Sequence, residues 1–219
     1  MVLEDTLKEI KSNALSRLGP DFLAAAEKSI EELRRSDIVE RFVKVGEMAP
    51  DFQASNPKGD LISLTSLVGQ GPVIISFYRG RWWPYCCAEQ VALQEILPDL
   101  ENKGATLVSI TPQISARIES NLRRYDLSFE ILTDPGNNIA QSFGVAFEMP
   151  EYLRSFYREK GIDLLSWNGD DSWTLPVPAN FVVGSDRRIL YASGDPDYTT
   201  RPDPSELVQV LDSLAESWV

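Results

Sequence analysis

The residues best suited to chemistry lie in the stretch FYRGRWWPYCCAEQVALQ, residues 77–94, which holds both cysteines of the chain, Cys86 and Cys87. A cysteine at the start of a helix meets free backbone N–H groups and the positive end of the helix dipole. Such a setting lowers the thiol pKa from about 8.5 and stabilises the nucleophilic thiolate. Trp83 stands three residues before Cys86, where a redox motif would hold another cysteine. The stretch therefore indicates a working thiol site, a thiol site that has lost its activity, or a site that is used for other chemistry.

The rest of the composition excludes several kinds of catalytic and metal site. The chain has no histidine, which excludes Ser-His and Cys-His catalysis and histidine metal ligands. Two adjacent cysteines do not make a metal site, so we expect neither a metal nor another cofactor. Neighbouring helical residues point about 100° apart, which disfavours a disulfide between Cys86 and Cys87. Redox turnover would then need an external thiol as reductant.

Several neighbours of the cysteines are candidates for the same site. Arg79 and Arg81 are nearby cations that would favour a thiolate. Trp82, Trp83 and Tyr85 are explained either by packing or by a pocket for a flat organic ligand.

The surrounding pattern predicts the elements that position these residues. The apolar run at 72–78 is typical of a strand buried on both faces, and a helix follows it at once over 88–104, with 83–87 in its first turn and Pro84 at the first position. Strands at 105–111 and 129–134 alternate with helices at 116–127 and near 137–144. A hairpin at 178–193 and a helix at 203–218 close the chain, whereas 151–173 reads as a helix with an irregular insertion. This order predicts an α/β domain with a mixed sheet, whose active loop follows the first inner strand.

The N-terminal segment has a different pattern. Apolar residues at helical spacing fill 4–18 and 21–35, and Gly-Pro at 19–20 separates them. We therefore expect a helical hairpin extension over residues 1–40 and the main domain over 41–219. The hairpin could cover the main domain, or it could serve as a dimerisation arm in a homodimer.

The overall charge restricts the partners. The chain of 219 residues carries 33 acidic and 21 basic side chains, a net charge of −12. Such a surface disfavours nucleic acid and anionic membranes as partners. No apolar run approaches the roughly 20 residues that span a bilayer, and the N-terminus lacks a signal-peptide core, so we expect a cytoplasmic location.

Several segments in order carry a family resemblance. The stretch 77–94 resembles the active-site segment of the peroxiredoxin-like branch of the alkyl hydroperoxide reductase/thiol-specific antioxidant family. VGEMAPDF, LVSITPQ, FEILTDPGNNIAQSFGV, LPVPANFVV and SGDPDYTTRPDPSELVQVL also resemble segments of that family, over roughly residues 44–214. The resemblance implies a thioredoxin-like sandwich, a mixed central sheet flanked by helices.

The resemblance also implies roles for single residues. The family's first motif cysteine, which attacks peroxide, falls on Trp83, and its second falls on Cys86. Tyr78 and Arg79 keep their places in the motif. Pro178 falls on the family's cis-proline, which implies a cis Val177–Pro178 bond.

Two functions from different classes are compatible with these residues. The first is a thiol-dependent oxidoreductase that acts on a peroxide or disulfide through Cys86, with Arg79 nearby and a low-molecular-weight or protein thiol as reductant. Cys87 is the second candidate, although packing as a small apolar residue is the preferred interpretation for it. An indole at position 83 cannot attack an O–O bond, so one of the remaining thiols would have to act as nucleophile.

The alternative is a thioredoxin-like domain without redox chemistry. It would bind or transform an aromatic or apolar metabolite between Trp82, Trp83, Tyr85 and the insertion around Trp167 and Trp173. Acid–base work would then fall to groups such as Tyr78, Asp170 and Asp171.

Overall fold

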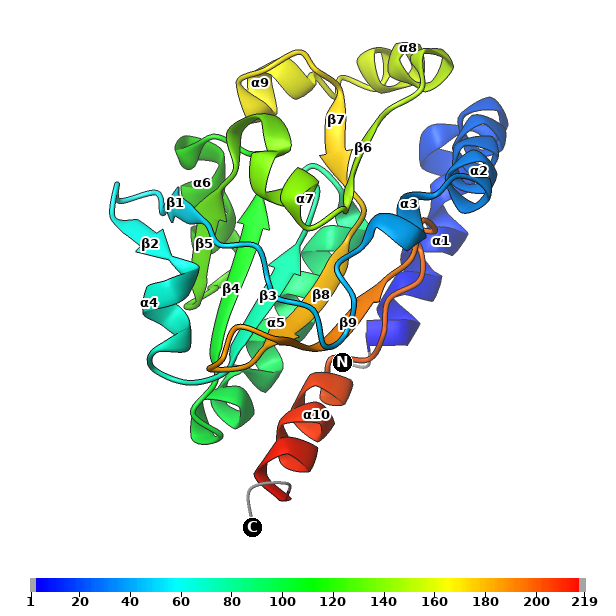
Figure 1. Ribbon diagram of the computed structural model, residues 1–219. Helices are drawn as coiled ribbons and strands as arrows, with labels where there is room; N and C mark the ends of the chain where they lie inside the picture. The colour runs from blue at the N-terminus through cyan, green and yellow to red at the C-terminus, as the bar shows by residue number, and fades with distance from the viewer. Residues whose placement is uncertain (1–2, 217–219) are drawn as a thin grey trace.

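The computed structural model describes residues 3–216, which form a mixed sheet surrounded by helices (Figure 1). The sheet has seven strands in the order β2-β1-β5-β4-β3-β8-β9, and a separate pair is formed by β6 and β7. The expected α/β class and mixed central sheet are confirmed.

The strands are short, and those at 73–77, 106–111, 130–133, 179–183 and 189–194 lie close to the predicted positions. They are β1 (Gln53–Ser55), β2 (Leu61–Ser63), β3 (Val73–Phe77), β4 (Thr106–Thr111), β5 (Glu130–Thr133), β6 (Ala146–Glu148), β7 (Thr174–Pro176), β8 (Ala179–Val183) and β9 (Ile189–Gly194).

The helices include the predicted ones and several short ones. They are α1 (Leu3–Leu18), α2 (Pro20–Arg35), α3 (Ile38–Arg41), α4 (Leu64–Val68), α5 (Pro84–Asn102), α6 (Ser115–Tyr125), α7 (Asn138–Ser142), α8 (Glu151–Glu159), α9 (Leu164–Asn168) and α10 (Ser205–Glu216), with a 3-10 turn at Pro135–Asn137. The predicted last helix reached residue 218, and its final residues lie outside the described part of the chain.

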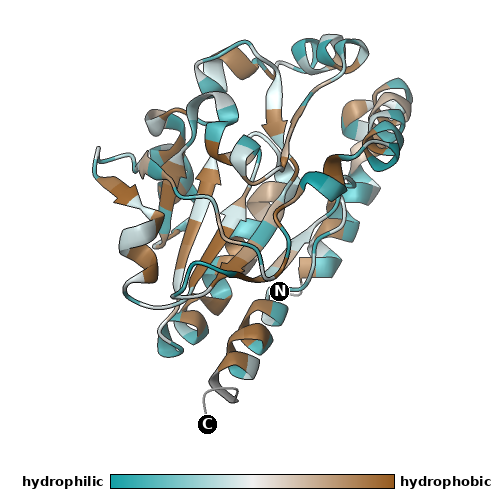
Figure 2. Ribbon diagram, viewed as in Figure 1, coloured by the Kyte–Doolittle hydropathy of each residue, from teal (hydrophilic) through white to brown (hydrophobic). Residues whose placement is uncertain are grey.

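The centre of the sheet is buried on both faces. All five residues of β3 are buried, as are all five of β8. Strand β3 pairs in parallel with β4 and antiparallel with β8, and the inner strands are strongly hydrophobic (Figure 2). Helix α5 joins β3 to β4, so its first turn lies beyond the carboxyl end of β3, where the active loop was expected.

The N-terminal hairpin packs on the main body. Helix α1 contacts α5, and α2 contacts α8, with Figure 1 showing both beside the sheet at the side of β9. Phe22 of α2 is buried and meets Phe156 at 6.2 Å and Tyr157 at 5.6 Å between ring centroids. The division of the chain after residue 40, and a role of the hairpin in dimerisation, both remain predictions.

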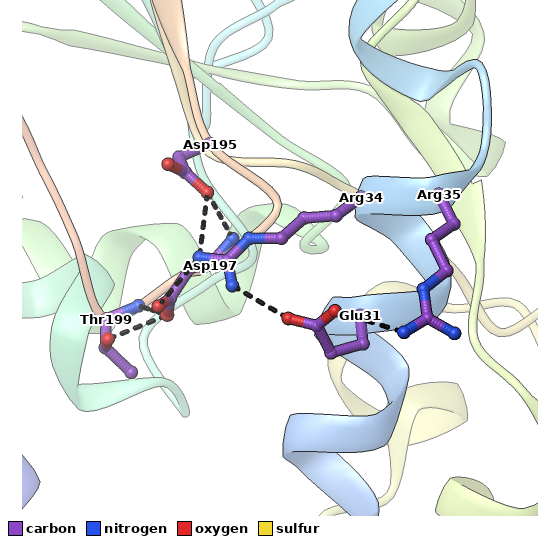
Figure 3. A network of polar contacts seen from close by, with 6 residues as sticks. All are labelled: Glu31, Arg34, Arg35, Asp195, Asp197 and Thr199. Carbon is purple, nitrogen blue, oxygen red and sulfur yellow. Dashed lines mark hydrogen bonds and ion pairs between the residues drawn. The ribbon is translucent and has the colours of Figure 1, made fainter.

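A polar network ties α2 to the loop after β9 (Figure 3). The Arg34 guanidinium lies 3.4 Å from the Asp197 carboxylate and 3.9 Å from that of Asp195. Glu31 pairs with Arg34 at 3.1 Å, and the Asp197 carboxylate also accepts a hydrogen bond from the Thr199 hydroxyl at 2.7 Å. These contacts join segments that are about 160 positions apart in the chain.

One glycine allows the backbone after the hairpin to approach the core. Gly144 has a φ of +76°, and a Cβ there would lie 1.9 Å from the carbonyl oxygen of Arg41. The neighbouring Val43 N–H donates to the carbonyl of Phe143 at 3.2 Å. Only glycine combines this conformation with so close an approach.

The expected cis bond before Pro178 is wrong, because the Val177–Pro178 peptide bond is trans. The chain runs on here from β7 to β8, and the Val177 N–H donates to the carbonyl of Val145 at 2.8 Å. The trans form is the favoured one even before proline.

Candidate functional site

The motif cysteines lie in the first turn of α5, as the sequence predicted. Trp83 is the N-cap residue and Pro84 opens the helix. The backbone N–H groups of Cys86 and Cys87 both donate to the carbonyl of Trp83, at 3.0 and 3.2 Å. Both thiols are free.

Cys86 is sealed inside the protein. Its exposed fraction is 0 %, and burial raises its thiol pKa above the ordinary value. The positive charge of Arg201 and a hydrogen bond from the backbone of Arg79 oppose this shift without cancelling it. The expected depression of the thiol pKa is therefore wrong for Cys86, because desolvation outweighs the helix start.

A buried ion pair lies beside Cys86. The Arg201 Nε lies 2.8 Å from a carboxylate oxygen of Glu89, and each side chain is 2 % exposed. Asn180 donates its side-chain amide to the same carboxylate at 3.0 Å. The carboxylate and the Cys86 thiol both keep the Arg201 pKa raised against the opposing, larger effect of burial. A fully buried pair like this one holds the C-terminal loop against α5.

Cys87 is the thiol that borders a cavity. Its side chain, 7 % exposed, lines a cavity of about 390 Å³ between α1 and α5. The thiol donates to the carbonyl of Arg81 at 3.1 Å. Burial raises its pKa to about 11, against a hydrogen bond with the Tyr125 hydroxyl and the charges of Arg81 and Arg124. The predicted shift to a low pKa is wrong here too, although the stabilising groups expected around a thiolate are present.

Trp83 is the centre of an aromatic cluster and is only 2 % exposed. Its ring stacks on Tyr157 at 5.9 Å with an interplanar angle of 14°, and Tyr198 meets it edge-on at 4.8 Å. Trp82 and Tyr85 lie 5.6 and 6.1 Å from it. The indole thus fills the place where the resemblance would put an attacking sulfur.

Arg79 lies under this cluster. Its guanidinium carbon is 4.9 Å from the centroid of Tyr198, 5.2 Å from Phe147 and 5.8 Å from Trp83. Its Nε donates to the carbonyl of Pro176 at 3.4 Å, and the side chain forms no ion pair with a carboxylate in the described part of the chain. A cation with an exposed fraction of 3 % is therefore held by aromatic rings, by the carbonyl of Pro176 and by a hydrogen bond with the side chain of Tyr157.

Two further cavities lie under the hairpin on either side of Trp83 and Tyr85. One, of about 340 Å³, lies between α1, α2 and the loop at 197–199, and its lining includes Glu27, Glu31 and Asp197. The other, of about 290 Å³, lies beside Trp82. The hairpin lines both cavities, and the insertion at 151–173 contributes Lys160 and Ile162 to the second.

The remaining predicted site residues are separated from these cavities. The Tyr78 hydroxyl is fully buried, accepts a hydrogen bond from Asn121 at 3.4 Å, and has a pKa raised by burial. Pro178 is buried on the link between β7 and β8. A phenol held in its neutral form does not suit the acid–base role considered for Tyr78.

The tryptophans and aspartates of the insertion that were expected at the aromatic pocket make other contacts. Trp167 lies under the guanidinium of Arg117 at 4.3 Å, and Trp173 meets Tyr157 edge-on at 6.4 Å. Asp170 accepts hydrogen bonds from Ser172, and Asp171 is exposed. None of these side chains lines a cavity around Trp83.

The sequence reasoning missed the partners contributed from distant segments. These are Tyr125 beside Cys87, Tyr157 and Tyr198 against Trp83, and Glu89 with Arg201 beside Cys86. Glu89 offered one signal, because a carboxylate in the apolar start of a buried helix needs a cation.

Two general searches complete the description. The described residues contain no group of three or more Cys, Asp or Glu side chains placed to hold a metal ion. Nor does any described helix combine the length and apolar character required to cross a bilayer.

Comparison with known proteins connects this site to a family. The AhpC/TSA family pattern matches residues 45–192, a segment that runs from just after the hairpin into β9 and contains both cysteines. The chain is 27 % identical over 133 residues to the putative peroxiredoxin bcp of Haemophilus influenzae, covering 61 % of this chain and 83 % of that protein. It is also 27 % identical over 152 residues to the thiol-disulfide oxidoreductase ResA of Bacillus thuringiensis, covering 69 % of this chain and 70 % of that one.

Solved structures agree on the fold. The peroxidoxin BcpB of Mycobacterium tuberculosis superposes with a TM-score of 0.62 at 18 % identity, over 78 % of this chain and 98 % of its own. The peroxiredoxin 6 of Arenicola marina superposes with a TM-score of 0.64 at 17 % identity, over 79 % of this chain and 74 % of its own. These likenesses confirm the thioredoxin-like sandwich. Because the family pattern covers well over half of the chain, the protein belongs to the AhpC/TSA family.

Proposed function

We propose that the protein is a thiol-dependent oxidoreductase that reduces peroxides through Cys87, with an external thiol as reductant. The observation that carries the proposal is that Cys87, and not Cys86, lines the cavity between α1 and α5. Membership of a family whose relatives include peroxiredoxins and thiol-disulfide oxidoreductases supports the reaction class.

The first half-reaction oxidises the sulfur. The Cys87 thiolate attacks one peroxide oxygen, an S–O bond forms and the O–O bond breaks. Cys87 becomes a sulfenic acid, and the departing alkoxide or hydroxide takes up a proton to leave as alcohol or water. The Tyr125 hydroxyl and the charges of Arg81 and Arg124 are placed to stabilise the thiolate before attack.

The second half-reaction restores the thiol. A low-molecular-weight or protein thiol attacks the sulfenic sulfur, which forms a mixed disulfide and releases water. A second external thiol attacks that disulfide, returns Cys87 to its thiol and leaves as the oxidised reductant. Cys86 does not resolve the intermediate in this scheme, because its neighbouring position on the helix disfavours a bond to Cys87. A reducing cytoplasm would supply the external thiol.

Single serine substitutions test the proposal. In an assay of peroxide consumption with dithiothreitol, Cys87→Ser should lower the rate at least about tenfold, to the level of the reagent alone. Cys86→Ser should keep more than about half of the rate, because its sulfur does not border the cavity. Far-UV circular dichroism of both variants checks that they fold. Equal activity of wild type and Cys87→Ser would rule the proposal out.

A further inference from the structure

The cavity of about 290 Å³ beside Trp82 differs from its neighbours in the charges around it. Its lining contains two cations, Arg17 of α1 and Lys160 after α8, and no carboxylate. The other cavities that α1 helps to line each include acidic side chains, Glu95 in one and Glu27, Glu31 and Asp197 in the other. Two cations without an adjoining carboxylate favour an anionic ligand, although the chain as a whole has a net charge of −12.

Neither rim cation is engaged within the protein. Arg17 and Lys160 are exposed and form no ion pair or side-chain hydrogen bond in the part of the chain that the structure describes. Many other cations of the chain do have carboxylate partners, including Arg34, Arg154 and Arg201. The two free cations therefore leave positive potential at the mouth of the cavity.

The interior of the cavity is apolar and aromatic. Ile10, Ala14 and Leu18 of α1 face Trp82, Trp83 and Tyr85 across it, with Ile162 at one side. The rings of Trp82 and Trp83 meet at 62°, so they present two differently inclined faces. Such walls suit a flat ring system, which gains from offset and edge-to-face contacts.

Two buried donors at these walls lack acceptors. The indole N–H groups of Trp82 and Trp83 are both buried and have no hydrogen-bond partner within residues 3–216. Because both nitrogens are closed to solvent, a ligand in the cavity would meet the ring carbons of the two tryptophans and not their N–H groups. Arg79 adds a buried cation 5.8 Å behind the Trp83 ring.

From the charges and the aromatic walls together, we infer that this cavity binds a small aromatic carboxylate. The ring system lies against Trp82, Trp83 and Tyr85, and the carboxylate lies at the mouth with Arg17 and Lys160. This binding site is separate from the proposed sulfur chemistry, because Cys87 does not line the cavity.

Isothermal titration with a matched pair of probes tests the site. The full-length protein is titrated with 1-naphthoate and with 1-naphthamide, which has the same ring system without the charge. We expect the carboxylate to bind at least about tenfold more tightly, as charge-assisted contacts imply. Equal affinities, or no binding of either probe up to millimolar concentration, would overturn the inference.

Two double variants locate the charge effect. Arg17→Gln/Lys160→Gln should reduce the preference for naphthoate to less than about threefold while leaving the affinity for naphthamide unchanged. Lys58→Gln/Arg123→Gln removes the same charge from exposed positions away from the cavity and should keep the full preference. Loss of preference in both would show a general charge effect and would refute the site.

Trp82→Phe checks the interior of the cavity. It keeps a ring at the wall but a smaller one, so both probes lose contact area and should bind more weakly by about two- to fivefold. Retention of full affinity for both probes by this folded variant would contradict the location.

Discussion

The chemistry at the start of α5 is decided by burial more than by position on the helix. Cys86 and Cys87 share the same first turn, yet one is fully sealed and the other borders a cavity. For both, desolvation is the largest influence and raises the thiol pKa. The positive end of a helix therefore does not by itself make a reactive cysteine.

The raised pKa of Cys87 predicts how the rate of its alkylation depends on pH. Its pKa of about 11 means that the thiolate fraction grows about tenfold for each pH unit below that value. In Cys86→Ser, alkylation of Cys87 by iodoacetamide should therefore accelerate about tenfold per unit from pH 7 to pH 10. The rate is measured by mass spectrometry of the labelled protein.

A free cysteine peptide is the control for that profile. Its thiol has a pKa of about 8.5, so its rate should level off near pH 9. A plateau for Cys87 already at pH 8 would contradict the raised pKa.

The residues around the cysteines show what sequence reasoning can reach. The helix start, Pro84 at its first position and the free thiols followed from local pattern. The exposure of each sulfur did not, because it depends on Arg201 from the C-terminal loop and on α1 from the N-terminal hairpin. Partners that arrive from distant segments leave no local signal.

Helices and strands were likewise predictable only where the sequence carries a local pattern. Strand β3 and helices α1, α2 and α5 were predictable from hydrophobic period and from proline and glycine punctuation. The short strands β6 and β7, at 146–148 and 174–176, were not, because three residues carry too little pattern and their pairing spans the insertion. The packing of the hairpin on α5 and α8 could not be predicted either. An amphipathic pattern shows that a helix has an apolar face, but it does not show which element covers that face.

A glycine pair tests the close contact between the end of the hairpin segment and the core. Gly144→Ala should lower the free energy of unfolding by more than about 3 kcal/mol, because it adds a backbone clash at Arg41 to a left-handed φ. Gly161 has a similar φ of +73° with nothing within 4 Å of the added carbon. Gly161→Ala should therefore cost only about 1–2 kcal/mol. Urea denaturation measures both, and equal losses would contradict the close approach.

At the scale of the whole molecule, the structure combines a family segment with additions at both ends. The family pattern covers residues 45–192, whereas the hairpin, Tyr198, Arg201 and α10 lie outside it. These outlying parts supply one side of each cavity under α1 and the cation beside Cys86, and the other side comes from the family segment. The cavities therefore lie where the segment matched by the family pattern meets the terminal segments.

Buried weak acids throughout the molecule make its stability fall in alkali. Burial raises the pKa of Cys87 to about 11 and that of Tyr157 to about 12. A group whose pKa is raised on folding contributes stability below its unfolded pKa, and that contribution is lost as the pH rises through the folded value. The loss for Cys87 should therefore lie between about pH 9 and pH 11 and reach about 2 kcal/mol.

Urea denaturation at pH 8, 9, 10 and 11 measures this loss. The free energy of unfolding should decline with pH, and the decline between pH 9 and 11 should be smaller in Cys87→Ser, which lacks the titrating sulfur. An identical decline in wild type and variant would contradict the contribution of Cys87 and would assign the decline to the other buried acids, Cys86 and the tyrosines.

The packing of the hairpin on the main body also affects how the chain folds during its synthesis on the ribosome. Phe22 emerges early, but its ring partners Phe156 and Tyr157 are made more than a hundred residues later. Until α8 has been synthesised, the apolar face of α2 lacks these packing partners, and exposed apolar surface makes a nascent chain prone to aggregate. We therefore expect holding chaperones to bind the growing chain at residues 20–35 and to leave once α8 has been synthesised.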